Sequence, residues 1–316
     1  MNDISCVALS GGVGGAKLAL GLSHAMDPAK LMLIANTGDD FEHLGLHISP
    51  DIDTLIYTLS GLADPETGWG RDGETWSFMN ALGQMGGETW FRLGDRDLAL
   101  HVERTRRLSC GEKLGGVTDA IRRRLSIAAS IVPMSDDPVR TIVETPDGPL
   151  AFQHYFVRDQ CRPCVTGFRF EGASESRPGD GMLDAILCAD LVVICPSNPF
   201  ISIDPILAVP GIRDSLLASN AAIVAVSPII GGRAVKGPTA KMMTELGLDT
   251  TVIEVARHYH GLIDGMVLDD VDREMADAVE RLGCKAMVTN TMMNSLSDRV
   301  SLARATIAFA DRLKES

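Results

Sequence analysis

The sequence predicts an α/β fold in which a mostly parallel sheet carries helices on both faces. The first observation behind this prediction is that short apolar runs alternate with helical patterns along much of the chain, which is typical of β-α-β units. The second is the length of 316 residues, enough for one large α/β domain. The third is composition: 45% hydrophobic residues and a mean hydropathy of +0.11 describe a compact, soluble protein.

The predicted elements follow one another in chain order. The first strand covers residues 4–9, and a helix at residues 16–25 follows it. Further strands are predicted at residues 30–36, 190–195, 221–227, 251–255 and 286–289. Apolar residues at helical spacing then predict an amphipathic C-terminal helix over residues 299–314.

Residues 64–180 interrupt this alternation. Helical patterns come in succession at residues 74–85, 95–107 and 111–126. A hairpin follows, with strands at 139–145 and 150–158 on either side of a Pro-Asp-Gly turn. We therefore expect a single α/β domain over residues 1–316, with 64–180 as a smaller helical and hairpin insertion that forms a lid over the C-terminal edge of the sheet.

Charge and cysteine usage argue against several classes of protein. The net charge is −13 and the pI is near 4.9, whereas binding to nucleic acid requires a cationic surface. No apolar run is long enough to cross a bilayer, and the chain begins without a basic leader. The chain has seven cysteines, an odd number in mostly apolar contexts, which fits reduced thiols. Cys161 and Cys164 have the spacing of a redox or zinc half-site, but a single such pair indicates structural or incidental thiols. We expect a cytoplasmic protein with no nucleic-acid or membrane partner.

A glycine-rich loop joins the first predicted strand to the first helix. It reads Ser-Gly-Gly-Val-Gly-Gly-Ala-Lys and contains Gly11, Gly12, Gly14 and Lys17. Glycines let the backbone approach a phosphate, and a helix N-terminus offers unpaired N–H groups. The loop is not a Walker A motif, because Lys17 does not directly follow a glycine and Leu18 replaces the Ser or Thr. The pattern indicates a phosphate or nucleotide without saying which, and a tight turn with no ligand has the same composition.

Four carboxylates and an imidazole crowd into residues 36–54, just after the second predicted strand. They are Asp39, Asp40, His47, Asp51 and Asp53. Carboxylates gathered at the C-terminal edge of a strand repel one another unless a cation lies among them, and this edge is where α/β proteins bind ligands. Mg²⁺ takes one or two carboxylates together with the oxygens of a substrate phosphate. The alternative is that these residues are ordinary loop and helix-cap residues.

The helix that follows places two of these acids in its first turn. Ser49 is predicted as the N-cap and Pro50 as the first helical residue. The first turn then contains Asp51 and Asp53, where the helix dipole favours a carboxylate in any case. Our hypothesis is that Asp51 reaches Mg²⁺ while Asp53 caps the helix.

Other polar loops follow predicted strands or begin predicted helices. With Asp95 as a cap, Arg96 and Arg104 face an anionic or heteroaromatic ligand, or else form part of a surface helix stabilised by i,i+4 pairs. Ser197 and Asn198 follow a central strand. Lys236 belongs to a cationic, glycine-rich loop that also contains Gly231, Gly232, Arg233, Gly237 and Lys241. Together these strand-end loops predict a Rossmann-like nucleotide crevice.

In this order, the motifs resemble the 2-phospho-L-lactate transferase family (CofD-like) of deazaflavin coenzyme F-420 biosynthesis. The residues that carry the resemblance are 11–17, 36–40, 47–54, 69–70, 93–101, 152–158, 197–199, 211–213 and 227–241. The combination of Pro-Asp-x-Asp-Thr with Leu-Gly-Asp-Arg-Asp-Leu-Ala is specific to this family. Val13 stands where archaeal-type members tend to have Thr, so any contact from that hydroxyl is absent here.

The resemblance implies a transferase. A guanosine-diphospho-activated three-carbon acid would be attacked by the terminal ribityl hydroxyl of Fo (7,8-didemethyl-8-hydroxy-5-deazariboflavin), so that a phosphodiester forms and GMP leaves. The acid is phospholactate, phosphoenolpyruvate or 3-phosphoglycerate, and no residue distinguishes them. The family also suggests a homodimer.

The resemblance further implies roles for individual residues. Asp39, Asp40 and Asp51 would hold Mg²⁺ directly or through water, and Asp51 and Arg96 match positions associated with the deazaflavin and the metal–phosphate centre. Asp51 or His47 is the expected general base. Substrate and nucleotide contacts are expected from Gly11, Gly12, Gly14, Lys17, Asn36, Thr54, Ser197, Asn198 and Lys236, with the two lysines near the diphosphate.

Two alternatives belong to other classes. The gluconeogenesis-factor proteins, which bind UDP-sugars, resemble the chain only in the glycine loop and the Asp39-Asp40 pair. A Mg²⁺-dependent kinase or nucleotidyl transferase would need a phosphate-binding Lys-Ser/Thr motif, which the sequence lacks.

Overall fold

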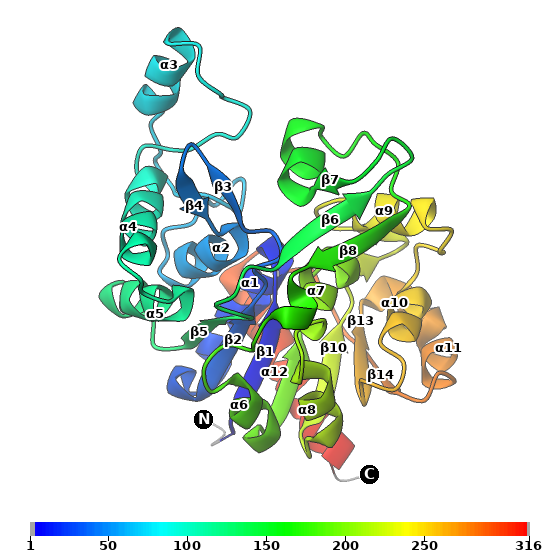
Figure 1. Cartoon of the computed structure of the whole chain (residues 1–316). Helices are drawn as coiled ribbons and strands as arrows, with labels where there is room; N and C mark the ends of the chain where they lie inside the picture. The colour runs from blue at the N-terminus through cyan, green and yellow to red at the C-terminus, as the bar shows by residue number, and fades with distance from the viewer. Residues whose placement is uncertain (1–3, 315–316) are drawn as a thin grey trace.

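The protein is built on a seven-stranded sheet in which every strand pairing is parallel (Figure 1). The computed structural model describes residues 4–314. The strand order is β14-β13-β10-β9-β1-β2-β5. The strands are β1 (Cys6–Ser10), β2 (Leu31–Ala35), β5 (Ser130–Pro133), β9 (Leu191–Ile194), β10 (Ala222–Val226), β13 (Gly265–Leu268) and β14 (Lys285–Val288).

The strand order reverses beside β1. The chain runs outward from β1 through β2 to β5, then returns to the other side of β1 at β9 and continues outward to β14. Helix α1 (Gly12–Ala25) follows β1 and packs on one face, whereas α8 (Ile212–Ala218), between β9 and β10, packs on the other. The loops after β1 and β9 therefore part at the C-terminal edge, which is where a ligand crevice forms in sheets of this kind.

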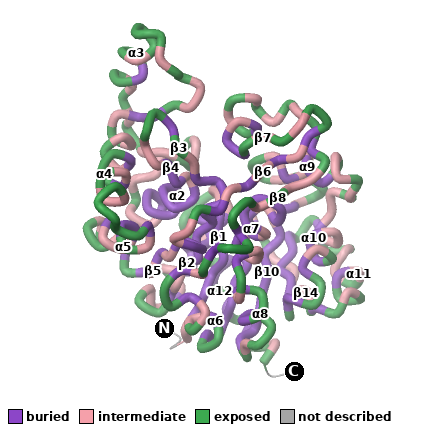
Figure 2. The backbone as a smooth tube through the Cα atoms, viewed as in Figure 1, coloured by how far each residue is buried: buried purple, intermediate pink, exposed green. Residues whose placement is uncertain are grey.

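Both faces of the sheet are covered by helices. One face carries α1, α2 (Pro50–Leu59), α5 (Leu114–Arg124) and α12 (Leu296–Lys314). The other carries α6 (Met182–Cys188), α7 (Asp204–Leu207), α8, α9 (Thr239–Glu245), α10 (Val252–His258) and α11 (Ala276–Glu280). The central strands are accordingly buried along their length, as Figure 2 shows. Within the described residues, no helix combines the length and apolar character needed to cross a bilayer.

Two smaller units stand over the C-terminal edge of the sheet (Figure 1). One is the hairpin β3 (Phe41–His43) and β4 (Leu46–Ile48), beside α4 (Asp97–Ser109) and the projecting helix α3 (Ser77–Gln84). The other is an antiparallel sheet of β6 (Arg140–Glu144), β7 (Leu150–Ala151) and β8 (Gly167–Glu171). A two-stranded ribbon, β11 (Ile229–Ile230) and β12 (Arg233–Ala234), follows β10.

The structure confirms most of the predicted elements of the main sheet and overturns one. Residues 251–255, predicted as a strand, lie in and just before helix α10. Thr251 Oγ1 accepts a hydrogen bond from the Glu254 N–H (3.3 Å) and caps this helix. The spacing Thr-x-x-Glu is a helix-start signal that the apolar run concealed. Strands β5 and β13 were not predicted, because four-residue apolar runs do not distinguish strand from helix.

The range 64–180 is less uniform than an insertion. Its three predicted helices correspond to α3, α4 and α5, but it also contains β5, the edge strand of the main sheet. The predicted hairpin forms between β6 and β7, although β7 has only two residues and residues 154–158 form a π-helical turn instead. The third strand, β8, was missed.

Helix α1 and helix α12 pack too closely to admit a side chain at Gly21. A Cβ atom there would lie 2.2 Å from the Arg299 carbonyl oxygen, whereas one on the helical Gly116 of α5 would meet nothing within 4 Å. We expect Gly21→Ala to lower the free energy of unfolding by about 1–3 kcal/mol through overpacking. Gly116→Ala should raise it by roughly 0.5–1 kcal/mol, because alanine favours a helix. Urea unfolding of both variants measures the difference, and equal changes would contradict this packing argument.

Candidate active site

The candidate site lies where the loops after β1 and β9 part. Ser197 Oγ accepts a hydrogen bond from the Gly11 N–H (3.1 Å) and donates one to the Gly11 carbonyl (2.7 Å). A Cβ atom on Gly14 would lie 2.4 Å from the Pro196 carbonyl oxygen. One on Gly15 would lie 2.6 Å from Ser197 Oγ. These glycines therefore let the two loops pack directly against each other.

Gly12 is the glycine of this loop that faces open space. Its φ is +64°, and a Cβ atom built on it would meet nothing within 4 Å. It is the first residue of α1, whose first-turn N–H groups have no partner inside the helix. A phosphate can approach the backbone here without meeting a side chain.

Asp51 connects three segments of the site. Its Oδ1 accepts a hydrogen bond from the Gly12 N–H (2.7 Å), and its Oδ2 accepts one from Asn36 Nδ2 (2.9 Å). Asn36 also donates to the Ile201 carbonyl and accepts from the Gly38 N–H (2.8 Å). One carboxylate thus joins the start of α2 to the start of α1 and to the end of β2.

Asp39 and Asp40 lie buried beside Asp51, and each has an oxygen without a partner. Asp39 Oδ1 and Asp40 Oδ1 are buried and form no hydrogen bond. Burial, together with the nearby charges of Asp51 and Asp40, raises the pKa of Asp39 well above its usual range. Burial also raises the pKa of Asp51 to about 6, although the hydrogen bonds from Asn36 and Gly12 oppose the rise. A site of this kind binds either a proton or a cation.

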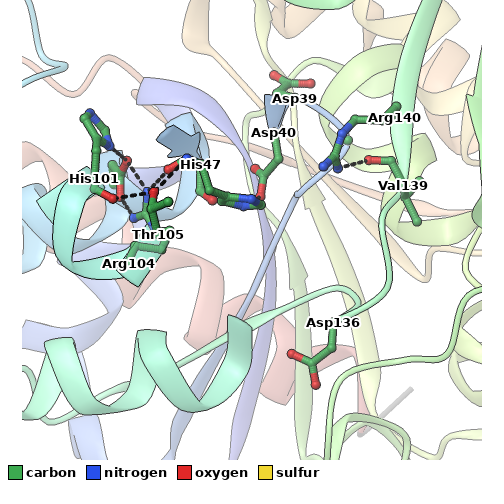
Figure 3. A network of polar contacts seen from close by, with 12 residues as sticks. Asp39, Asp40, His47, His101, Arg104, Thr105, Asp136, Val139 and Arg140 are labelled. Atoms are coloured by element: carbon green, nitrogen blue, oxygen red, sulfur yellow. Dashed lines mark hydrogen bonds and ion pairs between the residues drawn. The ribbon is translucent and has the colours of Figure 1, made fainter. Parts of the chain in front are cut away.

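His47 is held against Asp40 (Figure 3). Its Nε2 lies 3.2 Å from Asp40 Oδ2, which also accepts a hydrogen bond from Ser49 Oγ (2.7 Å). Ser49 is the N-cap residue of α2 as predicted, but its hydroxyl serves Asp40 and makes no capping bond. Among residues 4–314, no group of three or more His, Cys, Asp or Glu side chains has the arrangement of a complete metal site.

Asp53 does not cap the helix, which corrects our hypothesis for this residue. It forms a buried bidentate ion pair with Arg104 of α4, and His101 Nδ1 lies 3.7 Å from its Oδ2. Burial raises the pKa of Asp53, and the Arg104 charge opposes that rise. Arg104, which we expected to face a ligand, is 1% exposed, and its positive charge pairs with Asp53 inside the protein.

Arg96 is exposed and lies just before α4. It ends the segment of residues 71–96 that carries α3, which we call the arm. Its guanidinium donates to the Asp72 carbonyl (3.2 Å). Asp95 does not cap its own helix, contrary to our expectation: it accepts hydrogen bonds from the first N–H groups of α3, at Ser77 and Phe78 (both 3.0 Å). Glu74 instead accepts from the N–H groups of Arg96 and Asp97 at the start of α4 (both 2.8 Å). This crosswise capping fixes how the arm turns, and the sequence analysis missed Glu74.

The side chains of several predicted binding residues form hydrogen bonds within the protein. Thr54 Oγ1 donates to the Pro50 carbonyl within α2 (2.8 Å), and Asn198 Oδ1 accepts from the Phe200 N–H (3.0 Å). Lys236 Nζ donates to the Thr67 carbonyl (2.6 Å). The structure therefore gives these side chains structural roles, and their contacts with a ligand remain predictions.

Two residues near the acids were missed by the sequence analysis. Gln153 Nε2 donates to the Asp39 carbonyl (3.2 Å), which ties the loop after β2 to the chain that follows β7. Arg140 begins β6 and lies on the opposite side of Asp40 from His47 in Figure 3. Gln153 belongs to residues 152–158, which carry the family resemblance, but its position at the acidic loop, like that of Arg140, depends on the antiparallel sheet above the site.

The chain matches a known family over most of its length. Residues 6–293 match the family model described as 2-phospho-L-lactate transferase CofD. The chain belongs to the CofD family. It is therefore a transferase, as predicted, and the motifs that carry the resemblance extend over the matched range.

The relatives of this CofD-family chain carry two names. It is 40% identical to a phosphoenolpyruvate transferase from Streptomyces griseus, with 98% of this chain and 99% of that protein covered. It is 38% identical to a 2-phospho-L-lactate transferase from Methanocaldococcus jannaschii, with 96% and 98% covered. A solved structure of a UPF0052-family protein from Bacillus halodurans has a TM-score of 0.63 at 14% identity, covering 97% of this chain and 99% of that one. At this identity the likeness shows the α/β fold alone.

The buried ion pair gives a prediction about stability. Arg104→Met leaves the buried Asp53 carboxylate without its partner, so the free energy of unfolding should fall by about 3–5 kcal/mol. Arg106→Gln on the same helix removes an exposed pair with Glu103 and should change it little. Chemical unfolding measures both. The double variant Asp53→Leu/Arg104→Met should recover part of the loss, and no recovery would contradict this reading.

The raised pKa of Asp51 gives a prediction about pH. Because the folded pKa of about 6 exceeds the ordinary 3.8, folding takes up a proton, and this contribution to stability is lost as pH rises through about 6. In the metal-free protein, Asp51 and Asp39 should therefore favour a higher Tm at about pH 5 than at about pH 8. The lowered pKa values of His43 and His154 act in the opposite direction, so the role of Asp51 is tested by comparing this pH difference between the wild type and a variant. Asp51→Asn should reduce the difference. A difference as large in Asp51→Asn as in the wild type would exclude Asp51 as its source.

Proposed function

We propose that this transferase moves a phospho-three-carbon-acid group from its guanosine-diphospho-activated form to the terminal ribityl hydroxyl of Fo, releasing GMP, in coenzyme F-420 biosynthesis. Membership of the CofD family supports the reaction class. The single structural observation that carries the proposal is the juxtaposition of Asp39 and Asp40, each of which has one buried oxygen without a partner, with a glycine loop open to a phosphate at Gly12.

The acids fit Mg²⁺ as the cofactor. Mg²⁺ is held by one or two carboxylates and completes its shell with water and substrate phosphate, so an all-protein cage is not required. The unpartnered oxygens of Asp39 and Asp40 are the natural direct ligands. Asp51 already accepts two hydrogen bonds. It would therefore act on Mg²⁺ indirectly, through a bound water or through its negative charge. When bound, Mg²⁺ would neutralise charge on the transferring phosphate.

The chain's own residues would align the reaction. In the transfer, the ribityl oxygen forms a bond to the phosphorus that carries the three-carbon acid, the bond between the two phosphates breaks, and GMP leaves. Catalysis of this kind depends on positioning and charge neutralisation more than on covalent chemistry. Gly12 and the first turn of α1 would cradle the phosphates, with Lys17 and Lys236 beside them.

His47 is the better placed of the two candidates for the general base. Both oxygens of Asp51 are used in holding Gly12 and Asn36. His47 Nε2 faces the Asp40 carboxylate, and a carboxylate partner of this kind orients an imidazole so that its other nitrogen can accept the hydroxyl proton. We therefore propose His47 as the base and Asp40 as the residue that orients it.

Part of the region proposed as a lid already lies over the glycine loop. A Cβ atom on Gly68 would lie 2.9 Å from Val13 Cγ1 and 3.3 Å from Lys236 Nζ. The turn at residues 64–70 therefore rests on the first turn of α1. We propose that this turn, with Arg96 and the arm beyond it, closes over Fo, and that the protein acts as a homodimer.

The donor is proposed only as a class. The relatives at 40% and 38% identity are named for phosphoenolpyruvate and for 2-phospho-L-lactate, respectively, so overall identity does not choose between these acids. The two acids differ by a double bond. The third candidate, 3-phosphoglycerate, carries its phosphate on the terminal carbon and has a free hydroxyl group on the carbon that bears the phosphate in phospholactate.

The decisive experiment is a transfer assay. The purified protein is given Mg²⁺, Fo and each guanosine-diphospho donor in turn, and GMP release is measured together with the deazaflavin phosphodiester. We expect turnover with at least one donor. Asp40→Asn should reduce kcat by about 100-fold or more, through loss of electrostatic stabilisation.

Asp277→Asn, an exposed acid on α11, is the matched control and should turn over like the wild type. Failure with every donor, combined with a Tm raised by a UDP-sugar and not by Fo or GDP, would replace the transferase by a UDP-sugar-binding protein.

A further inference from the structure

Three cations of the described chain lie along α1 and form no ion pair with a carboxylate. Lys17 Nζ donates to the Met293 carbonyl (3.0 Å), and Lys236 Nζ donates to the Thr67 carbonyl. Arg299 Nε is buried and has no hydrogen-bond partner. Asp298, the chain neighbour of Arg299, acts on Arg299 only through its charge. In the described part of the chain, none of the three cations lies within ion-pair distance of a carboxylate, although the whole protein has a net charge of −13.

The packing of α1 explains how these cations come together. Val13, Lys17 and Gly21 are spaced four residues apart and share one face of the helix. Val13 and Lys236 Nζ both border Gly68, as described above. One helical turn beyond Lys17, a Cβ atom on Gly21 would lie 3.2 Å from Arg299 Cβ. Lys17 therefore lies between a cation from the loop after β12 and a cation from α12.

The charges of Arg299 and Lys236 both act on Lys17. Burial, followed by these two charges, lowers the pKa of Lys17. Gathering like charges costs free energy unless an anion joins them. Lys17 and Lys236 lie beside a helix N-terminus and a glycine whose open side admits a ligand, which is the setting in which proteins bind phosphates. Arg299 lies one helical turn farther along α1.

We propose that Arg299 is a third phosphate-binding residue, which together with Lys17 and Lys236 binds the diphosphate of the nucleotide donor. The proposal rests on the proposed function for the identity of that donor. It does not rest on the family match, which ends at residue 293. The planar guanidinium can pair with two phosphate oxygens at once, which a lysine ammonium cannot do.

The consequence is a role for the C-terminal helix in substrate binding. Sequence analysis treated residues 299–314 only as an amphipathic helix. Its first turns also position Arg299, and the Met293 carbonyl just before the helix holds Lys17. Docking of α12 on α1 therefore brings both cations to the donor.

The test is titration calorimetry of pyrophosphate, GDP and guanosine with the full-length protein. Arg299→Gln should weaken pyrophosphate and GDP about tenfold or more, since it removes a charge-assisted hydrogen bond, and should leave guanosine unchanged. Arg304→Gln, exposed on the same helix, is the control and should bind all three like the wild type. Arg299→Lys should bind several-fold more weakly than the wild type.

A second readout separates binding from packing. Removing Arg299 relieves its repulsion with Lys17 and also loses its attraction to Asp298, so the unliganded Arg299→Gln protein should have a Tm close to that of the wild type. A lower Tm with unchanged pyrophosphate and GDP affinity would assign Arg299 to packing alone and overturn the proposal. If Arg299→Gln does not fold, unaltered pyrophosphate and GDP affinity in Arg299→Lys overturns it equally.

The remaining outcomes concern the identity of the anion. Weaker pyrophosphate with unchanged GDP would place a free phosphate, not the nucleotide, at Arg299, and would overturn the donor assignment. Weaker GDP in a protein that transfers nothing to Fo would support Arg299 and reject only the reaction proposed above.

Discussion

The site depends on one interaction, the pair of hydrogen bonds that the Asp51 carboxylate accepts from the Gly12 N–H and from Asn36. These bonds join the starts of α1 and α2 to the end of β2, at the point where the strand order reverses. The fit leaves no room for a side chain at Gly11, whose Cβ would lie 2.7 Å from Asp51 Oδ2 and 2.6 Å from Ser202 Cβ. The glycines therefore serve the packing of the loops as much as the approach of a ligand.

Three further buried acids lie near this interaction, and they are of two kinds. Asp53 is neutralised inside the protein by Arg104, so it supports α2 and takes no part in binding. Asp39 and Asp40 each have a buried oxygen without a partner. Burial and the charges of Asp51 and Asp40 disfavour the charged form of Asp39, which suits the cation that we propose arrives with the substrate.

Charge is thus distributed around the glycine loop in a way that suits a metal–diphosphate ligand. The acids lie on the side of Asp51, at the end of β2 and the start of α2, whereas Lys17, Lys236 and Arg299 follow one face of α1. A diphosphate can bind the cations directly and the acids through Mg²⁺. The turn at residues 64–70 rests on Val13 and Lys236, so the proposed closure of the arm and the proposed binding of the phosphates would involve the same residues.

The sequence by itself determined the α/β class, the glycine loop, the acidic segment and the family, because each of these depends on local periodicity or on residues close together in the chain. It also placed Asp51 and Asp53 in the first turn of one helix. Only the tertiary structure decided their different roles, since Arg104 lies 51 residues beyond Asp53 and reaches it through the packing of α4. The crosswise caps of Glu74 and Asp95 and the approach of Arg299 to α1 have the same origin. They depend on how distant helices dock, which no local pattern records.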